Sequence, residues 1–293
     1  MEEIEEMKKV KNGLVLEGGA MRGMFTAGVC DVLMENNIEF DGACGVSAGA
    51  TFGCNYKSKQ IGRVIRYNKR FSKDKRYCSF SSLVKTGNLY NAEFCYETLP
   101  FELDIFDTET YGKNPMKFYA VATDIVTGKS VYRELKECNK EDLTFMRASA
   151  SMPLVSRPVE FEGLKLLDGG ISDSIPLEFM EKSGYSKNLV ILTQPKYFVK
   201  KQNSLYPLMK FFLRKYPALV KAMKERHIVY NKETDYVFSQ EKNHKAFVIC
   251  PQKSLNIKRT EKSPKELDRV YEEGRKAALE KLDALKVFLS KND

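Results

Sequence analysis

The sequence has no long apolar run. No stretch of its 293 residues approaches the roughly 18 apolar residues that a membrane-spanning helix needs. The N-terminal segment, residues 1–11, is acidic and then basic, and it lacks the apolar core of a secretory signal. We therefore expect a cytoplasmic protein, for which peripheral contact is the one form of membrane association left open.

Closely spaced cysteines are also missing. Such pairs are what a zinc site or a dithiol redox motif requires. Free thiols in a reducing compartment are the simplest expectation. The sequence gives no reason to expect a metal or another cofactor. The seven cysteines are Cys30, Cys44, Cys54, Cys78, Cys95, Cys138 and Cys250.

Acidic residues are in deficit, because Lys and Arg outnumber Asp and Glu by 48 to 39 and leave a net charge of +9. This balance suits contact with anionic lipid, phosphorylated substrates or nucleic acid, and it equally suits a soluble protein without such partners. Aromatic and basic residues are not interleaved in a nucleic-acid-binding motif, so no nucleic-acid partner is expected.

Short apolar segments alternate with helical ones. A strand at residues 13–16 leads into a glycine-rich turn, a helix follows, and a second strand at 41–46 leads into Ser47. This alternation predicts an α/β fold with a mostly parallel central sheet flanked by helices. Further strands are expected at 117–124, 130–133, 165–167, 188–193 and 246–250, and further helices at 48–54, 57–77, 141–148 and 263–289.

No linker or repeat divides the chain, so one domain over residues 1–293 is expected. Its motif-bearing core covers residues 13–195. The remaining portion, 196–293, is expected to be mainly helical and to return one strand, 246–250, to the same sheet.

Ser47 lies at the centre of Gly45-Val46-Ser47-Ala48-Gly49, between a strand and a helix. A serine on such a tight turn projects its hydroxyl above the sheet, and side chains two residues away on either side would collide. Gly45 and Gly49 remove that collision. The following helix also points its N-terminal amides towards the serine. We predict a nucleophile here; the alternative interpretation is a serine helix cap.

The glycine-rich turn runs from Gly18 through Gly19, Ala20, Met21 and Arg22 to Gly23. Acyl transfer places negative charge on a carbonyl oxygen, and a turn without obstructing side chains can supply backbone amides to it. A dinucleotide-binding turn is the main alternative, but Ala20 stands where that fingerprint needs its second glycine. A plain structural turn is the other alternative.

Asp168, Gly169 and Gly170 follow an expected strand, and the ends of strands are where open sheets meet ligands. By itself this is a common turn.

A histidine base is the usual partner of a catalytic serine, but only His227 and His244 are present, and neither lies at a strand end beside small residues. A Ser-Asp-His triad therefore stays open as the less favoured arrangement.

These three motifs, in this order, resemble those of patatin-like phospholipases. Residues 147–153, Arg-Ala-Ser-Ala-Ser-Met-Pro, match a stretch usually found between serine and aspartate in that family. Residues 17–23, Glu-Gly-Gly-Ala-Met-Arg-Gly, are similar to the first motif of its bacterial members. The resemblance covers roughly residues 13–180. It implies a three-layer sandwich and a lipid acyl hydrolase of the phospholipase A type.

The resemblance also implies the residue roles. Ser47 attacks the ester and Asp168 accepts its proton. Because an ordinary aspartate, with a pKa of about 3.9, is a weak base, burial must raise its pKa. Arg22 orients the turn or meets a phosphate. Ala20 departs from the pattern, since many relatives have glycine there, and this leaves the exact shape of the turn open. The oxyanion hole would comprise amides around Gly18, Gly19, Ala20 and Met21, and the supporting glycines would be Gly23, Gly45, Gly49, Gly169 and Gly170.

Residues 205–226 are basic and amphipathic, and Pro217 is expected to split them into two helices. The apolar side chains can pack on the sheet, or the segment can lie on an anionic membrane.

A lipid or another acyl ester is the expected partner. The alternatives are an esterase or thioesterase of soluble acyl substrates and a silent binding protein on the same fold. The sequence does not define the headgroup, the acyl position or the oligomeric state. The apolar side chains of residues 205–226 that fall on one helical face are Leu208, Phe212, Tyr216, Leu219 and Met223.

Overall fold

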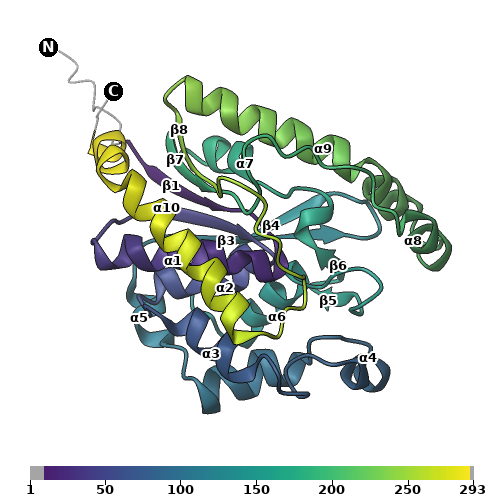
Figure 1. Ribbon diagram of the computed structural model, residues 1–293. Helices are drawn as coiled ribbons and strands as arrows, with labels where there is room; N and C mark the ends of the chain where they lie inside the picture. Colours follow the sequence, from purple (N-terminus) through teal and green to yellow (C-terminus); the bar gives the residue numbers. More distant parts are fainter. Residues whose placement is uncertain (1–9, 291–293) are drawn as a thin grey trace, which may run out of the picture.

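The computed structural model describes residues 10–290, so residues 1–9 of the segment considered for a secretory signal lie outside it. An eight-stranded sheet runs through the molecule (Figure 1). Five of its strands are parallel neighbours, and the strand expected near the C-terminus is the last of them. In spatial order they are β3 (Lys117–Asp124), β2 (Gly42–Val46), β1 (Asn12–Leu16), β7 (Lys187–Ile191) and β8 (Ala246–Ile249).

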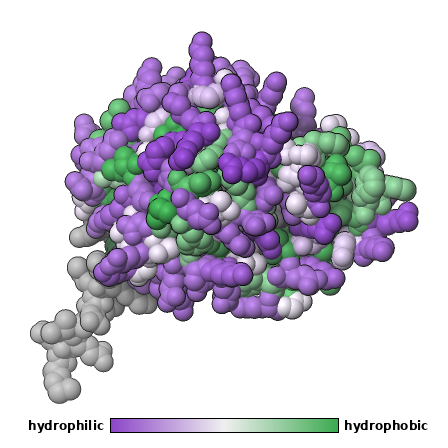
Figure 2. Space-filling view, turned by 90° about the horizontal axis from the view of Figure 1, so that it is seen from below, coloured by the Kyte–Doolittle hydropathy of each residue, from purple (hydrophilic) through white to green (hydrophobic). Residues whose placement is uncertain are grey.

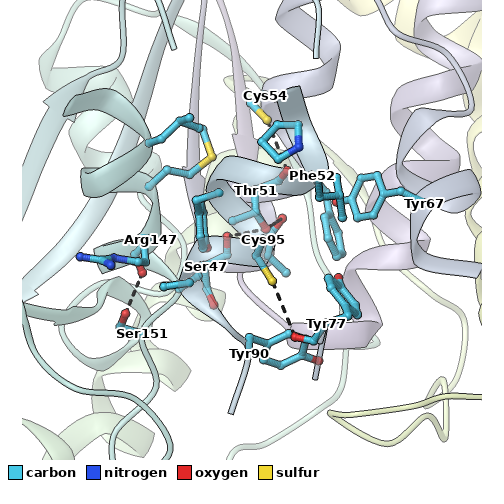
Figure 3. A pocket seen from close by; sticks show the side chains of 18 of the residues that line it. Ser47, Thr51, Phe52, Cys54, Tyr67, Tyr77, Tyr90, Cys95, Arg147 and Ser151 are labelled. Atoms are coloured by element: carbon cyan, nitrogen blue, oxygen red, sulfur yellow. Dashed lines mark hydrogen bonds between the residues drawn. The ribbon is translucent and has the colours of Figure 1, made fainter. Parts of the chain in front are cut away.

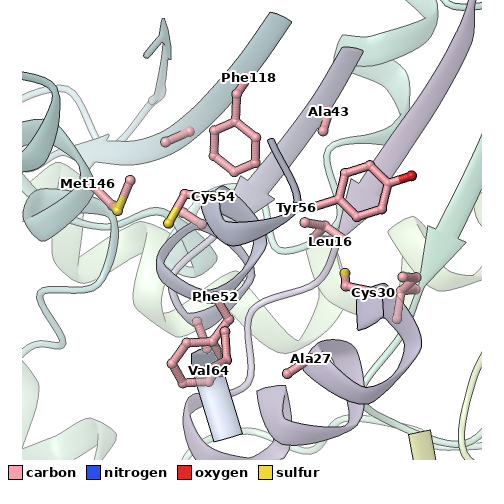
Figure 4. Close-up of a cluster of buried hydrophobic side chains, with 14 of the residues drawn as sticks. Leu16, Ala27, Cys30, Ala43, Phe52, Cys54, Tyr56, Val64, Phe118 and Met146 are labelled. Carbon is pink, nitrogen blue, oxygen red and sulfur yellow. The ribbon is translucent and has the colours of Figure 1, made fainter. Parts of the chain in front are cut away.

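Both faces of the parallel strands are buried, which explains their nearly continuous apolar sequences. In β1, Leu14 and Leu16 belong to the apolar cluster on one face, whereas Val15 belongs to the cluster on the other. Figure 4 shows part of the first cluster, where Leu16 and Phe118 of the sheet lie near Phe52 and Met146 of helices.

Helices cover both faces, so the expected three-layer α/β arrangement is confirmed (Figure 1). α7 (Leu177–Lys182) and α9 (Pro217–Lys242) lie on one side of the sheet. The helices on the other side include α1 (Gly23–Glu35), α2 (Ala48–Lys57), α3 (Arg63–Phe71), α6 (Lys140–Ser149) and α10 (Pro264–Ser290).

Two antiparallel strands flank β3 in a way that positions the site. The hairpin strand β4 (Ser130–Glu134) pairs with residues 119–123 of β3 and so occupies one of its edges. The other edge is shared: β2 pairs with residues 117–121, and β6 (Leu164–Asp168) pairs antiparallel with residues 122–124. The C-terminal ends of β2 and β6 therefore meet end to end. The short strand β5 (Val159–Phe161) pairs with β6 beyond this point.

The helix expected over residues 57–77 is wrong in extent. α2 continues to Lys57, a turn follows, and α3 covers only Arg63–Phe71. Gly62 takes φ +73°, a left-handed conformation that a continuous helix excludes. Three further elements in this part of the chain were not predicted. Two are too short to show a helical repeat, α4 (Phe80–Thr86) and α5 (Thr108–Lys113). The third, η2 (Phe94–Leu103), is a π-helix that contains Pro100 and therefore lacks the α-helical period.

Pro217 does separate two helices, α8 (Tyr206–Phe212) and α9. The single apolar face expected across them does not form, because the chain turns at the proline. Leu219 and Met223 are buried on α9, whereas Leu208 and Phe212 on α8 are exposed. No helix between residues 10 and 290 is both long and apolar enough to cross a membrane.

Candidate active site

Ser47 occupies the sharp turn between β2 and α2, with φ +54° and ψ −119°. This conformation is strained for a residue with a side chain. A Cβ on Gly45 would lie 2.5 Å from the carbonyl oxygen of Gly49, and one on Gly49 would lie 2.3 Å from that of Leu16. The two glycines predicted to flank the serine are therefore required by close backbone approaches.

Asp168 ends β6 and lies opposite Ala122, while Val46 lies opposite the preceding residue, Val121. This register brings the carboxylate beside the serine that follows Val46. The Ser47 hydroxyl donates a 2.7 Å hydrogen bond to Asp168 Oδ2, and the Gly170 amide donates a 2.8 Å bond to Oδ1. The two side chains that sequence reasoning selected are thus in direct contact.

The Asp168 carboxylate is buried, and burial raises its pKa above the ordinary value. The Ser47 hydrogen bond and the nearby charge of Arg226 act in the opposite direction but do not cancel this effect. A buried carboxylate with a raised pKa is a stronger proton acceptor than one in water.

The glycine-rich turn runs close beside the serine. A Cβ on Gly18 would lie 2.9 Å from the Val46 carbonyl oxygen, and Ala20 has φ +49°. Within residues 10–290, the amides of Gly18 and Gly19 donate to no protein acceptor. They are thus available to a developing oxyanion. Arg22 points its Nε towards Thr193 Oγ1, at 3.4 Å, and a Cβ on Gly23 would lie 2.8 Å from the Phe52 ring.

The end of α6 supports both motifs at once. The Ser149 hydroxyl accepts a 2.9 Å hydrogen bond from the Ser47 amide, and the Ser151 carbonyl accepts a 2.8 Å bond from the Asp168 amide. Both serines lie in the Arg-Ala-Ser-Ala-Ser-Met-Pro stretch, which carried a sequence signal but no assigned role. The Thr123 hydroxyl adds a 2.9 Å bond to the Asp168 carbonyl.

Arg226 of α9 is a further contact that sequence reasoning missed. Its Nε donates to the carbonyl oxygen of Gly170, on the turn that follows Asp168. In sequence it appeared as one of many cations in a basic helix, with nothing to mark it. Only the packing of α9 over the strand ends reveals it. Gly169 fits this turn tightly, because a Cβ there would lie 2.2 Å from the Val121 carbonyl oxygen.

A cavity of about 1110 Å³, its open mouth included, leads away from Ser47 (Figure 3). Aromatic, aliphatic and sulfur-containing side chains make up most of the walls. The π-helix η2 forms part of one wall, and such helices are enriched at functional sites. The apolar lining includes Phe52, Tyr67, Tyr77, Tyr90, Cys95, Tyr96, Leu99, Phe106, Leu143 and Met146.

Two arginines also line this cavity. Arg63 is buried and paired with Asp104, with Nε and Oδ1 3.2 Å apart. Arg147 lies near the serine in Figure 3, and its buried Nε has no hydrogen-bond partner among residues 10–290. The charge of Arg63 is therefore neutralised by a carboxylate, whereas Arg147 keeps a hydrogen-bond donor free for a ligand.

The two histidines lie on or just after α9. In the described part of the chain, the Ser47 hydroxyl bonds to Asp168 and to neither imidazole. His227 Nδ1 is buried without a partner there, and His244 follows the C-cap residue of α9 with φ +56°. Nor do residues 10–290 contain a group of three or more His, Cys, Asp or Glu that could hold a metal ion.

The first curated relatives are similar to this chain over part of its length. YjjU of Escherichia coli, named an uncharacterized protein, is 31% identical over 197 residues, which are 62% of this chain and 52% of YjjU. The uncharacterized NTE family protein Mb1092c of Mycobacterium bovis is 28% identical over 164 residues, 56% of this chain and 44% of its own. The chain thus spans about half the length of these two relatives.

More distant similarities extend to a named enzyme and a solved structure. Lysophospholipase NTE1 of Scheffersomyces stipitis is 29% identical over 173 residues, 59% of this chain and 11% of the enzyme. The crystal structure of VipD from Legionella pneumophila aligns with a TM-score of 0.47 and 13% identity, over 94% of this chain and 67% of VipD.

Two family models match the chain. A domain of unknown function (DUF6363) matches residues 216–290, which include α9 and α10. The model of patatin-like phospholipases matches residues 14–180 and contains Ser47, Asp168 and the glycine-rich turn. Because that match covers more than half of the 293 residues, this chain belongs to the patatin-like phospholipase family.

Proposed function

We propose that this chain is a lipid acyl hydrolase in which Ser47 is the nucleophile and Asp168 the base. The observation that carries this proposal is the 2.7 Å hydrogen bond between the Ser47 hydroxyl and the buried Asp168 carboxylate, at the end of an apolar cavity. Membership of the patatin-like phospholipase family supports lipid hydrolysis. The name lysophospholipase on a fungal relative supports a phospholipid-like substrate.

In the first half of the reaction, Ser47 Oγ bonds to the ester carbonyl carbon while its proton passes to Asp168 Oδ2. The carbonyl oxygen becomes an oxyanion, which the free amides of Gly18 and Gly19 stabilise. Those at Ala20 and Met21 lie on the same turn, and both residues line the cavity. The C–O bond to the leaving alcohol then breaks, and the alcohol oxygen takes the proton from Asp168.

In the second half, Asp168 accepts a proton from water, and the hydroxyl attacks the acyl-serine carbonyl carbon. The Ser47–acyl bond breaks, Ser47 regains its proton and the fatty acid leaves. The mostly apolar cavity walls hold the acyl chain, because a hydrocarbon that packs against them is removed from water. We call this cavity the acyl pocket.

The chain is proposed to meet its substrate at an anionic membrane surface through peripheral contact. Hydrophobic surface gathers at the right-hand side of Figure 2, the side on which α4 and α8 lie in Figure 1. Large apolar side chains are exposed on both helices, namely Phe80, Val84, Leu208, Phe211 and Phe212. Exposed lysines and arginines surround them, including Lys75, Arg76, Lys85, Lys210, Arg214 and Lys215. Apolar anchors with basic neighbours favour anionic lipid over neutral lipid.

Active-site labelling and turnover test the proposal together. A fluorophosphonate should label the wild type and not Ser47→Ala. On esters of graded acyl length, Ser47→Ala and Asp168→Asn should each lower kcat/KM by about a thousandfold or more. The double variant of His227 and His244 should keep most activity. Preference for short soluble esters or thioesters would contradict the lipid assignment, and loss of activity in the histidine variant would contradict Asp168 as the base.

A further inference from the structure

Four cations lie close enough to act on one another electrostatically outside the acyl pocket, where α9 packs over the strand ends. Arg22 comes from the glycine-rich turn, Lys200 from the segment before α8, Arg226 from α9, and Arg259 from the loop before α10. We name them the cation cluster. None lines the acyl pocket. Two of them, Arg226 and Arg259, belong to residues 216–290, the region matched by a domain of unknown function.

A continuous series of contacts joins Arg22 to Lys200. Arg22 Nε lies 3.4 Å from Thr193 Oγ1, and the Thr193 amide donates a 2.6 Å bond to Glu17 Oε2. The Tyr230 hydroxyl donates a 2.9 Å bond to the other oxygen of Glu17. Lys200 Nζ lies 3.8 Å from the centre of the Tyr230 ring.

Arg226 enters the same place from α9. It precedes Tyr230 by four residues, so the two side chains share one face of the helix. Its Nε donates to the Gly170 carbonyl, and its Nη2 lies 3.3 Å from the position that a Cβ on Gly170 would occupy. Arg226 therefore links the cation cluster to the turn that carries Asp168.

The cluster keeps much of its charge and many of its donors unmatched. Within residues 10–290, none of the four cations lies within 4.0 Å of a carboxylate oxygen. Lys200 Nζ has no hydrogen-bond acceptor there, and neither has the Arg259 guanidinium. The nearby carboxylates of Glu17, Asp168 and Glu233 already accept hydrogen bonds from neutral donors. Arg22, Lys200 and Arg226 are half-buried and Arg259 is exposed, so an ion from solvent can reach them.

We propose that the cation cluster binds a phosphate group, carried either by the headgroup of the lipid substrate or by free phosphate. A tetrahedral dianion offers several acceptor oxygens to donors that converge from different elements, and arginine is well suited to such contacts. The headgroup form of this inference rests on the proposed acyl hydrolysis, since the cluster lies beside the turn of Asp168. The bound phosphate would place Arg226 and Arg259 of the C-terminal region in contact with the substrate.

The electrostatics of Lys200 agree with a missing anion. Burial, followed by the charge of Arg226, lowers the pKa of Lys200 to about 7, and Arg22 and Arg259 act in the same direction. The charge of Glu17 raises the pKa of Lys200, but this effect is smaller than the combined lowering by burial and the neighbouring cations. A bound phosphate would raise the pKa of Lys200 again, so binding at neutral pH should be accompanied by proton uptake.

Calorimetric titration of the full chain with inorganic phosphate is the first test. Lys200→Met places an uncharged side chain of similar length beside the Tyr230 ring, and Arg259→Gln removes an exposed charge, so both variants should fold. Each should weaken phosphate binding by about fivefold to tenfold, the effect of one partly screened charge. Neighbouring exposed residues supply matched controls, Lys201→Met and Lys258→Gln, which should bind within about twofold of the wild type.

Proton uptake, measured in buffers of different ionisation enthalpy, should disappear in Lys200→Met. Absent phosphate binding, or equal binding by all four variants, would overturn the proposal. These measurements do not depend on turnover, so a catalytically silent chain and a missing phosphate site give different results.

A pair of substrates then distinguishes the two sources of phosphate. An acylglycerol phosphate and the acylglycerol with the same acyl chain are compared by kcat/KM. If the headgroup is the natural ligand, the wild type should prefer the phosphate ester, and Lys200→Met and Arg259→Gln should reduce that preference by about tenfold. Phosphate binding without such a preference assigns the site to free phosphate.

Discussion

The amide of Ser47 donates a 2.9 Å hydrogen bond to the hydroxyl of Ser149, which lies 102 residues further along the chain. Two residues after Ser149, the Ser151 carbonyl accepts the amide of Asp168. One short segment at the end of α6 therefore fixes the backbone at both members of the Ser47–Asp168 pair. The strained conformation of Ser47 needs such external support, because its own φ of +54° is unfavourable.

Replacing Ser149 with alanine should leave the buried Ser47 amide without an acceptor. Such a loss costs about 1–3 kcal/mol of unfolding free energy. It should also displace the nucleophile and lower kcat by about tenfold to a hundredfold. Ser151→Ala is the control, because Ser151 holds Asp168 through its main-chain carbonyl. Urea unfolding and steady-state kinetics measure both effects, and an unchanged kcat in Ser149→Ala would show that the elbow does not depend on this bond.

The raised pKa of Asp168 predicts the pH dependence of turnover. The base must be ionised, so kcat/KM should fall as pH is lowered through the pKa of the folded protein. Because burial raises that pKa, the fall should begin at a higher pH than an ordinary aspartate, with a pKa of about 3.9, would give. A pH–rate profile on a neutral ester measures this. A midpoint at or below the ordinary value would contradict burial as the dominant influence.

The same shift predicts that Asp168→Asn is inactive and yet more stable at neutral pH. A folded-state pKa above the unfolded value means that stability falls as pH rises between the two values. Asparagine removes this ionisation, while its amide group can still accept from Gly170 and donate to Ser47. The stability advantage over the wild type should therefore be largest at about pH 7 and shrink towards about pH 4. Urea unfolding at several pH values measures it; an advantage that grows in acid would refute the argument.

The individual turns of the site could be found from sequence, because each carries its own residue pattern. That Ser47 and Asp168 meet could not be derived from those patterns. It depends on β2 and β6 sharing one edge of β3, a pairing that no local signal encodes. The contact of Arg226 with the Gly170 carbonyl could not be predicted for the same reason, because it depends on how α9 packs over the strand ends.

The parallel strands and the layers were predictable because strands buried on both faces have nearly continuous apolar sequences. The short helices α4 and α5 have too few turns to show a helical period. The apolar side chains from Leu208 to Met223 do not share one face, because the predicted break at Pro217 also turns α8 away from α9. Local chemistry therefore marked the candidate residues, whereas long-range packing decided which of them are neighbours.

Ala20 should tolerate glycine and reject β-branched residues. Its φ of +49° is energetically unfavourable for alanine, whereas glycine adopts this conformation without strain. Glycine, however, loses more backbone entropy on folding. We expect Ala20→Gly to change the unfolding free energy by less than about 1 kcal/mol and to keep activity within about threefold. Ala20→Val should lose most activity, because a β-branched residue disfavours positive φ. Full activity in Ala20→Val would mean that the shape of this turn is not needed.

Gly169→Ala tests the close packing of the turn behind Asp168. A Cβ there would lie 2.2 Å from the Val121 carbonyl oxygen, and only a backbone shift relieves that contact. The variant should lose about 3 kcal/mol or more of stability and most of its activity. Gly112→Ala is the matched control, since a Cβ on that exposed helical glycine meets no atom within 4 Å. It should be neutral or stabilise the chain by up to about 1 kcal/mol. Thermal unfolding of both variants decides between packing and a general intolerance of alanine.

The exposed ends of α4 and α8 should control membrane binding. Phe211 and Phe212 are 60% and 61% exposed, beside Lys210, Arg214 and Lys215. Each basic residue near an anionic surface contributes about 1 kcal/mol, and screening by salt reduces that contribution. The wild type should therefore bind vesicles containing phosphatidylserine more tightly than neutral vesicles, and the difference should shrink as salt is added.

Replacing both phenylalanines with serine should reduce vesicle binding by about tenfold or more, because two aromatic anchors are lost. Val287→Ser is a suitable control. Val287 is 56% exposed but belongs to the last turns of α10, which Figure 1 places at the opposite end of the molecule. Vesicle co-sedimentation measures all three proteins. Equal binding to neutral and anionic vesicles would exclude the basic residues as the cause, and equal loss in Val287→Ser would place the contact on another face.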